Sequence, residues 1–171
     1  MNQTTADNSD FGPDPHGRGS THQWRYGRER RRHQAVRPPP RAFLDERGRA
    51  CLLVPLDREG RGLAIVEERD YLAVRAMGAT GVWLANANTK RSRRYVRTSV
   101  PTGPQTATNV QVARLIVGAG PGTVVRYLNG NPLDLRRENL TWQRGQSKRD
   151  DALIAQRGTE FRVARAAEIL A

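Results

Sequence analysis

The sequence predicts one small α+β domain, built from short antiparallel strands and a C-terminal helix and preceded by a disordered tail. Two observations support this. Its apolar residues occur in short runs of strand length, and Gly, Pro and Asn separate those runs. A length of 171 residues suits one domain with tails. We expect a disordered basic tail over residues 1–41, a folded domain over 42–149 and a helical extension over 150–171.

The tail prediction rests on composition. Residues 1–41 are poor in aliphatic side chains and rich in Gly, Pro and Arg, with three consecutive prolines at 38–40. Such a segment buries too little apolar surface to fold. Trp24 and Tyr26 interleave with the basic second half. The tail is therefore either a leader without a role or a segment that contacts phosphates and stacks on bases.

The first folded elements are expected after residue 50. The apolar runs 51–56 and 62–66 predict two strands joined by a turn, and residues 67–77 predict a short helix that ends at Gly78. Segments 82–88 and 94–98 flank the basic residues 89–93, which have hairpin length. The sequence therefore predicts a basic hairpin.

The second half is expected to begin with a loop over 100–108. Residues 109–117 alternate like a strand that could run on as a helix, so their type stays open. Residues 123–128 predict a strand and 129–132 a tight loop. Asp134 is a suitable N-cap for a helix to about Trp142, and Thr159 for an amphipathic helix to Leu170.

The charge pattern predicts a polyanionic partner. The formal net charge is +12, and no Asp or Glu occurs between Tyr71 and Leu133. That stretch contains the basic residues Arg75, Lys90, Arg91, Arg93, Arg94, Arg97, Arg114 and Arg126. A surface that binds phosphates is the favoured interpretation, and a merely solvated basic face is the alternative.

Cysteine usage and hydropathy exclude other classes. Cys51 is the single cysteine, so it forms no internal disulfide, and it has no nearby Cys or His with which to hold zinc. We expect it to be a small core residue. No apolar run approaches the roughly 20 residues that cross a bilayer, and the N-terminus lacks the apolar stretch of a signal peptide. We therefore expect a soluble, cytoplasmic protein without a membrane partner.

One long motif carries a family resemblance. Residues 125–140 read Val-Arg-Tyr-Leu-Asn-Gly-Asn-Pro-Leu-Asp-Leu-Arg-Arg-Glu-Asn-Leu. This resembles the core of phage-type HNH homing endonucleases, Val-Asp-His-x-Asn-Gly-Asn-x-Leu-Asp-Asn-Arg-x-x-Asn-Leu. Residues 112–116 with 121–122, and residues 63–71, resemble the family's upstream strands and turns. The likeness spans about residues 50–149 and implies a ββα-metal unit at about 109–149.

The chain departs from the family at each position that carries chemistry. In the family, an Asp binds a divalent ion, the following His deprotonates water, an Asn completes the metal site, and a further His lies upstream. The matching positions hold Arg126, Tyr127, Lys148 and Ala113. Cations at ligand positions exclude a metal, and a phenol with a reference pKa of about 10 is a poor base. Hence we expect no catalytic or metal-binding residues and no cofactor.

The rest of the motif is expected to be structural. The three histidines, His16, His22 and His33, all lie in the predicted tail. Asn139 matches a family Asn that positions the base, but here a local backbone hydrogen bond is the favoured role. Leu133, Leu140 and Trp142 are expected in the core, and Arg136 or Arg137 as a salt-bridge or phosphate partner.

Together these patterns predict a protein that binds double-stranded DNA on an HNH-like scaffold and has no nuclease activity. The predicted DNA-binding residues are Lys90, Arg91, Arg93, Arg94, Arg97, Arg114, Arg126, Arg136, Arg137 and Lys148. Two alternatives stay open. One is an HNH endonuclease that uses Mg or Mn in a rearranged site with Asp134, Asn129 or the tail histidines. The other is an RNA-binding or particle-associated structural protein. The oligomeric state is also open.

Overall fold

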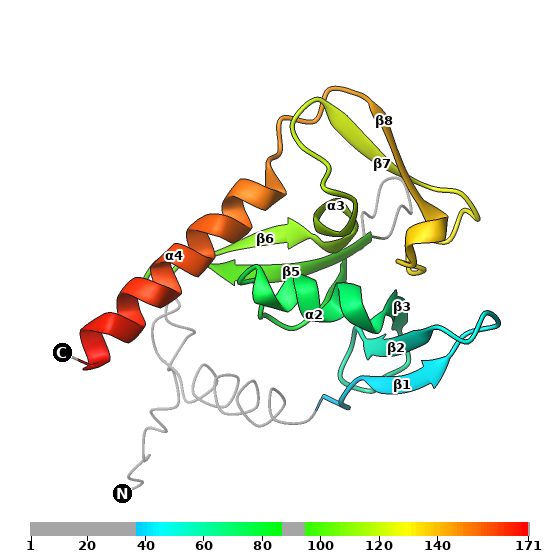
Figure 1. Ribbon diagram of the computed structural model, residues 1–171, viewed down its shortest axis with the longest axis horizontal. Helices are drawn as coiled ribbons and strands as arrows, with labels where there is room; N and C mark the ends of the chain where they lie inside the picture. Colours follow the sequence, from blue (N-terminus) through cyan, green and yellow to red (C-terminus); the bar gives the residue numbers. More distant parts are fainter. Residues whose placement is uncertain (1–36, 87–94, 171) are drawn as a thin grey trace, which may run out of the picture. The chain divides into compact units, whose positions relative to one another are not determined.

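The computed structural model describes residues 37–86 and 95–170. Small antiparallel sheets and helices alternate along the chain, which ends in a long helix (Figure 1). The α+β class is therefore confirmed, together with the small antiparallel sheets and the C-terminal helix. Within the described ranges, none of the helices is both long enough and apolar enough to cross a membrane.

The first sheet contains β1 (Arg41–Leu44), β2 (Ala50–Pro55) and β3 (Leu63–Glu67) in sequence order. Successive strands are antiparallel, with Leu53 opposite Ile65 at the middle of the β2–β3 pair. The predicted strands at 51–56 and 62–66 are confirmed as β2 and β3. Strand β1 was not predicted, because its Arg41–Leu44 sequence is too short and too exposed to show a pattern.

Helix α2 (Glu68–Ala76) follows β3 directly and confirms the helix expected over 67–77. Acidic side chains at Glu68 and Asp70 suit its first turn, where they complement the helix dipole. Gly78 follows the helix with φ at +88°. A residue in this left-handed region commonly ends a helix, and glycine adopts it without strain.

The second sheet contains β4 (Leu84–Asn86), β5 (Tyr95–Pro101) and β6 (Ala107–Gln111). Burial alternates along β5, so that Val96 and its even-numbered neighbours face the core. The pairing of β4 with β5 matches the expected hairpin, whose connection at 87–94 lies outside the described residues. The loop that was expected over 100–108 is shorter, because β5 continues to Pro101 and β6 begins at Ala107.

The segment after β6 resolves the ambiguity at 109–117. The chain leaves β6 at Gln111 and continues as helix α3 (Val112–Val117), so both predicted types are present in turn. Gly118 ends α3 in the left-handed conformation, with φ at +63°. Nearly all of α3 is buried, including Arg114.

The third sheet corrects the sequence prediction. Strand β7 (Thr123–Tyr127) is followed by a loop, the single 3-10 turn η1 (Arg137–Asn139) and strand β8 (Leu140–Arg144). β7 and β8 pair as an antiparallel hairpin, so the α-helix expected from Asp134 to Trp142 is wrong. Trp142 is also not a core residue, because 54% of it is exposed, whereas Leu140 is buried as expected.

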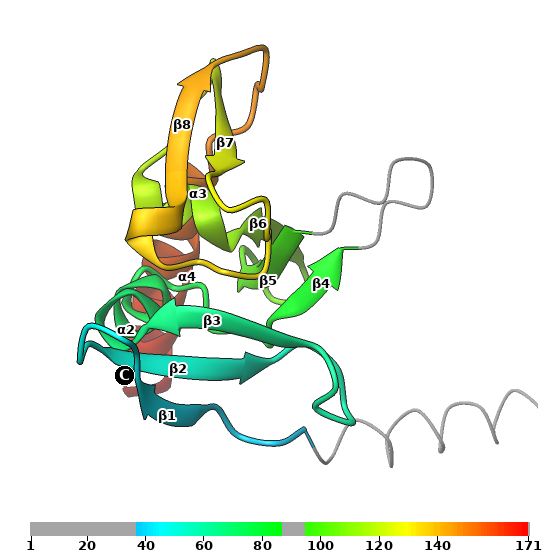
Figure 2. The same cartoon turned by 90° about the vertical axis from the view of Figure 1, so that its right-hand side faces the viewer.

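The loop between β7 and β8 lies alongside β3, as Figure 2 shows in yellow and green. The backbone N–H of Ile65 donates to the carbonyl of Leu133 at 2.9 Å, and that of Leu135 donates to the carbonyl of Ile65 at 2.7 Å. Residues 133–135 thus extend the first sheet by a short parallel bridge. This pairing covers the edge of β3, which would otherwise expose unpaired backbone groups.

Helix α4 (Asp151–Leu170) begins eight residues before the expected start at Thr159. Asp150 provides the cap, since its Oδ1 accepts from the N–H of Leu153 at 2.9 Å. Thr159 is an interior residue that donates to the carbonyl of Ala155. The first half of α4 packs on β5 and β6, where Ala155 joins the common core, and the last nine residues of the helix are exposed.

The folded unit also begins earlier than expected. Arg37 donates hydrogen bonds to the carbonyls of Pro55 and Trp83, and β1 starts at Arg41. The boundary of the predicted tail at residue 41 is therefore wrong. The remainder of that tail, residues 1–36, lies outside the described residues.

Candidate nucleic-acid interface

Two of the predicted DNA-binding arginines are held by acidic side chains around the β7–β8 loop. The Arg136 guanidinium contacts Asp134 at 2.7 Å, and only 16% of its side chain is exposed. The Arg137 guanidinium makes three hydrogen bonds of 2.7 to 3.0 Å to Asp70 on α2. Of the two roles left open for this pair, the salt bridge is the one present.

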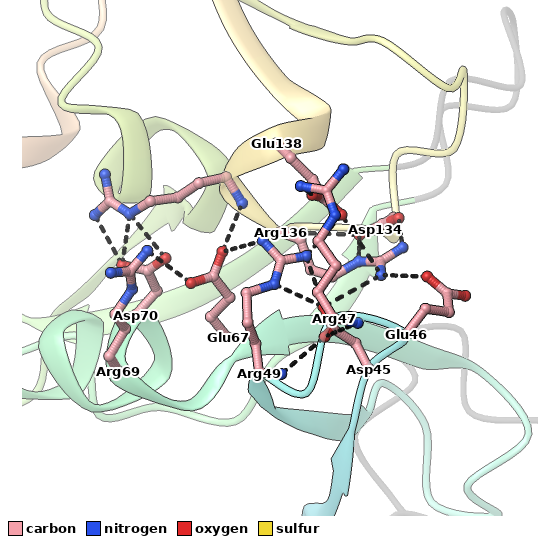
Figure 3. Close-up of polar contacts among 11 residues, drawn as sticks. Asp45, Glu46, Arg47, Arg49, Glu67, Arg69, Asp70, Asp134, Arg136 and Glu138 are labelled. Carbon is pink, nitrogen blue, oxygen red and sulfur yellow. Dashed lines mark hydrogen bonds and ion pairs between the residues drawn. The ribbon is translucent and has the colours of Figure 1, made fainter.

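Further ion pairs tie this loop to the first sheet (Figure 3). Glu138 contacts Arg47 and Arg49 from the β1–β2 turn, each at 2.7 Å. Arg49 also contacts Asp45 at 2.6 Å, and its hydrogen bonds hold the pKa of that carboxyl at about 2. Ion pairs to α2 and to the β1–β2 turn, together with the backbone bridge to β3, therefore hold the β7–β8 loop in place.

The polar side chains of the loop satisfy one another. Asn139 is 4% exposed and donates from Nδ2 to the carbonyl of Asp134 at 2.7 Å, while its Oδ1 accepts from the N–H of Asn129. This confirms its expected backbone role. Burial raises the pKa of Asp134, but hydrogen bonds from Arg136 and Asn129 outweigh it, so the net pKa is lowered. Asp134 acts as a loop brace rather than as a helix cap.

Arg114 is a buried structural residue. It is 3% exposed, and its Nε lies 3.0 Å from Oδ2 of Asp151, a fully buried carboxylate at the start of α4. Its terminal nitrogens donate to four carbonyl oxygens, those of Ala119, Gly120, Thr123 and Arg149. Because the guanidinium cannot reach a phosphate from there, the prediction that Arg114 contacts DNA is wrong.

The four positions that correspond to the family's catalytic and metal-binding residues lie on three segments: α3, β7 and the connection before α4. Ala113 is fully buried in α3, Arg126 is exposed on β7, and Lys148 is exposed on the connection between β8 and α4. Tyr127 is half-buried on β7, where its hydroxyl accepts from Nε2 of Gln111 at 3.3 Å. Burial raises the pKa of Tyr127 above its ordinary value. Because its pKa is raised, the Tyr127 side chain forms even less phenolate at neutral pH than a phenol in water does, which makes it a poor general base.

No family model, no curated protein and no solved structure matches this chain. The site must therefore be judged from its own residues. A divalent ion of the kind an HNH resemblance implies needs oxygen ligands. Arg126 and Lys148 offer cations at the matching positions instead, so these residues do not fit the ion. Within residues 37–86 and 95–170, no three His, Cys, Asp or Glu side chains gather as a metal-binding group.

Among the predicted DNA-binding residues, three have no acidic partner within the described ranges: Arg97, Arg126 and Lys148. Arg97 lies on the outer face of β5 and lines a cleft together with Arg149. The Nε of Arg97 is buried and has no hydrogen-bond partner among the described residues. Lys90, Arg91, Arg93 and Arg94 lie outside the described residues, so their predicted role stays a prediction.

Sequence reasoning missed Arg149 and Arg144. Both lie near the junction of β8 and α4, and Arg144 is exposed at the end of β8. Arg149 reaches the cleft because its guanidinium bends back to the carbonyl of Asn109 on β6. The only signal was the basic run at 148–149 beside Asp150 and Asp151, which resembles any solvated surface turn.

Proposed function

We propose that this protein binds double-stranded DNA through phosphate contacts on a scaffold that resembles the HNH endonucleases, and that it does not cleave DNA. One observation carries the proposal. At the positions that match the family's ligands and bases stand two exposed cations, a hydrogen-bonded phenol and a buried alanine. The two cations attract a phosphate, and the four residues together supply no carboxylate or imidazole to bind a metal or act as a base.

The order of elements along the chain supports the resemblance. β7, β8 and α4 follow one another as a hairpin and a helix, the order of a ββα unit, but over residues 123–170 instead of the expected 109–149. α4 packs on β5 and β6. The Asn-Gly-Asn turn of the motif occupies the hairpin loop, and Gly130 there has φ at +74°. A glycine meets that backbone requirement without strain. The order of elements and this turn are the two features that support the proposed likeness.

The rival endonuclease with a rearranged site gains no support from the loop. Asp134 is 2% exposed and accepts hydrogen bonds from Arg136 and Asn129. An ion at Asp134 would have to displace a guanidinium that lies 2.7 Å from its carboxylate. Asn129 is itself engaged with Asp134. The tail histidines lie outside the described residues.

The salt dependence of DNA binding tests the proposal. Neutralising about six to eight phosphates predicts a log-log slope of roughly −5 to −7 for affinity against salt concentration. Replacing Arg126 and Lys148 together by Ala should make the slope shallower by about 2. The matched control replaces two exposed arginines of α4, Arg157 and Arg165, by Ala. A wild-type slope shallower than about −2 in fluorescence anisotropy would contradict the proposal.

A further inference from the structure

A cleft with a volume of about 400 Å³ opens on the second sheet, next to the hydrogen bond between Gln111 and Tyr127. β5 and β6 provide most of its walls, and the segment before α4 provides the rest. Its polar lining residues are Tyr95, Arg97, Thr108, Asn109, Gln111 and Arg149. None of the residues that line it is acidic. The volume lies in the range of small-ligand sites in proteins.

Strand register places the polar groups of the cleft on one face of the sheet. Arg97 lies directly opposite Gln111 in the β5–β6 pair. Tyr95 is two residues from Arg97 on β5, and Asn109 is two residues from Gln111 on β6, so all four side chains share this face. The opposite face holds the buried side chains of the core, such as Val96. The cleft is therefore a polar, basic surface on a rigid sheet.

The charges of the cleft are not compensated locally. Arg149 and Arg114 share the single carboxylate of Asp151, so the three groups together keep one positive charge. The other nearby carboxylate, Asp150, accepts from the backbone at the start of α4. Arg97 adds a second positive charge, and its buried Nε has no partner among the described residues. A buried donor without a partner favours an anionic ligand oxygen.

We propose that this cleft binds one nucleotide unit, as a free nucleoside monophosphate or as an unstacked nucleotide of a DNA strand. The inference rests on the proposed function and specifies what one part of that surface recognises. Arg97 and Arg149 bind the phosphate, and the Tyr95 ring stacks on the base. The carboxamides of Asn109 and Gln111 hydrogen-bond to the base edge. Gln111 keeps its Oε1 as an acceptor, because its Nε2 donates to Tyr127.

Calorimetric titration of the full-length protein tests the site with defined probes. We expect thymidine 5′-monophosphate or another deoxynucleoside 5′-monophosphate to bind at least tenfold more tightly than the nucleoside or inorganic phosphate alone. Arg97→Ala should weaken binding of that nucleotide at least tenfold, and so should Asn109→Ala, which changes an exposed side chain with little risk to folding. Arg157→Ala, an exposed charge on α4, should alter it less than twofold.

A second arm distinguishes a free nucleotide from one within a strand. The probes are a fully paired duplex and the same duplex with one unpaired nucleotide, each compared in wild type and Arg97→Ala. Tighter binding of the second duplex that disappears in Arg97→Ala supports recognition within a strand. Tight monophosphate binding without that preference supports recognition of the free nucleotide.

Two results would overturn the inference. One is inorganic phosphate that binds as tightly as the monophosphates. The other is a wild type that prefers neither the monophosphates over the nucleoside nor the duplex with an unpaired nucleotide over the paired duplex. Failure of the broader proposal looks different. Loss of all duplex binding with intact monophosphate binding would reject DNA binding and leave the nucleotide site standing. Salt-dependent duplex binding in wild type, without either of these preferences, would reject the nucleotide site and leave DNA binding standing.

Discussion

Among the single residues, Arg114 shows that an arginine in a basic stretch of sequence need not lie on the surface of the protein. Arg114 and Arg126 are both arginines of the acid-free stretch, yet Arg114 is buried against Asp151 and Arg126 is exposed. The apolar neighbours of Arg114 in α3 were the one available sign of burial. The ion-pair partner lies 37 positions away along the chain, where local patterns cannot reveal it.

Removing this buried cation should strongly destabilise the fold. Arg114→Ala leaves the half-exposed Arg149 as the only cation on the Asp151 carboxylate within the described residues, and it strips four carbonyl oxygens of this donor. We expect a loss of about 3–5 kcal/mol in the free energy of unfolding, measured by urea denaturation. The matched control, Arg126→Ala, should change it by less than about 0.5 kcal/mol. Equal stability of the two variants would contradict the assigned role of Arg114.

The lowered pKa of Asp45 predicts how stability depends on pH. Its pKa lies near 2 in the folded protein against an ordinary value of 3.8, because Arg49 donates to the carboxylate. A lowered pKa stabilises the fold above the unfolded value and ceases to do so as pH falls through the folded one. The melting temperature should therefore fall between about pH 4 and pH 2.

Asp45→Asn should reduce the steepness of that fall in a thermal denaturation series. The control is Glu59→Gln, which removes a carboxylate from an exposed turn between β2 and β3. It should keep the wild-type pH dependence. An unchanged acid transition in Asp45→Asn would show that this carboxylate is not held as described.

At the scale of elements, the sequence was sufficient for β2, β3 and α2, where strand and helix patterns are local. It failed for residues 134–142, because Asp134 has the residue type of a helix cap but uses its carboxylate on Arg136 and Asn129. The β7–β8 pairing and the bridge to Ile65 then fix the loop in a non-helical form. Those contacts are non-local, so local propensity could not predict them.

Close packing of α4 on β5 gives a test at this scale. A Cβ on Gly158 would lie 2.0 Å from Cγ1 of Val100, a buried and β-branched side chain. Gly158→Ala should therefore destabilise the fold by about 1–3 kcal/mol, despite the better helix propensity of alanine. Gly120→Ala is the control, since nothing lies within 4 Å of its Cβ position. Stabilisation by Gly158→Ala in urea denaturation would contradict this packing.

At the scale of the whole molecule, composition indicated the sign of the surface but not its location. The net charge of +12 is divided between cations that hold the fold together and cations that remain accessible. Around the β7–β8 loop, Arg49, Arg136 and Arg137 form ion pairs with acidic side chains. Their partners are Glu138, Asp134 and Asp70, respectively. The accessible cations are therefore fewer than the sequence suggests, and the cleft beside Arg97 emerges only from strand pairing.

The proposed function is DNA binding through phosphate contacts, without metal chemistry. At about 4 Å and an effective dielectric constant near 20, a divalent ion and one unit cation repel by roughly 8 kcal/mol, which disfavours a metal beside Arg126 or Lys148. Supercoiled plasmid is incubated with the purified wild-type protein in magnesium and in EDTA. One gel then reports both the mobility shift and the nicking of the plasmid. We predict equal shifts in the two conditions and intact supercoiled plasmid after the protein is removed. Nicking in magnesium that EDTA abolishes would show that the protein is a metal-dependent nuclease and would overturn the proposed function.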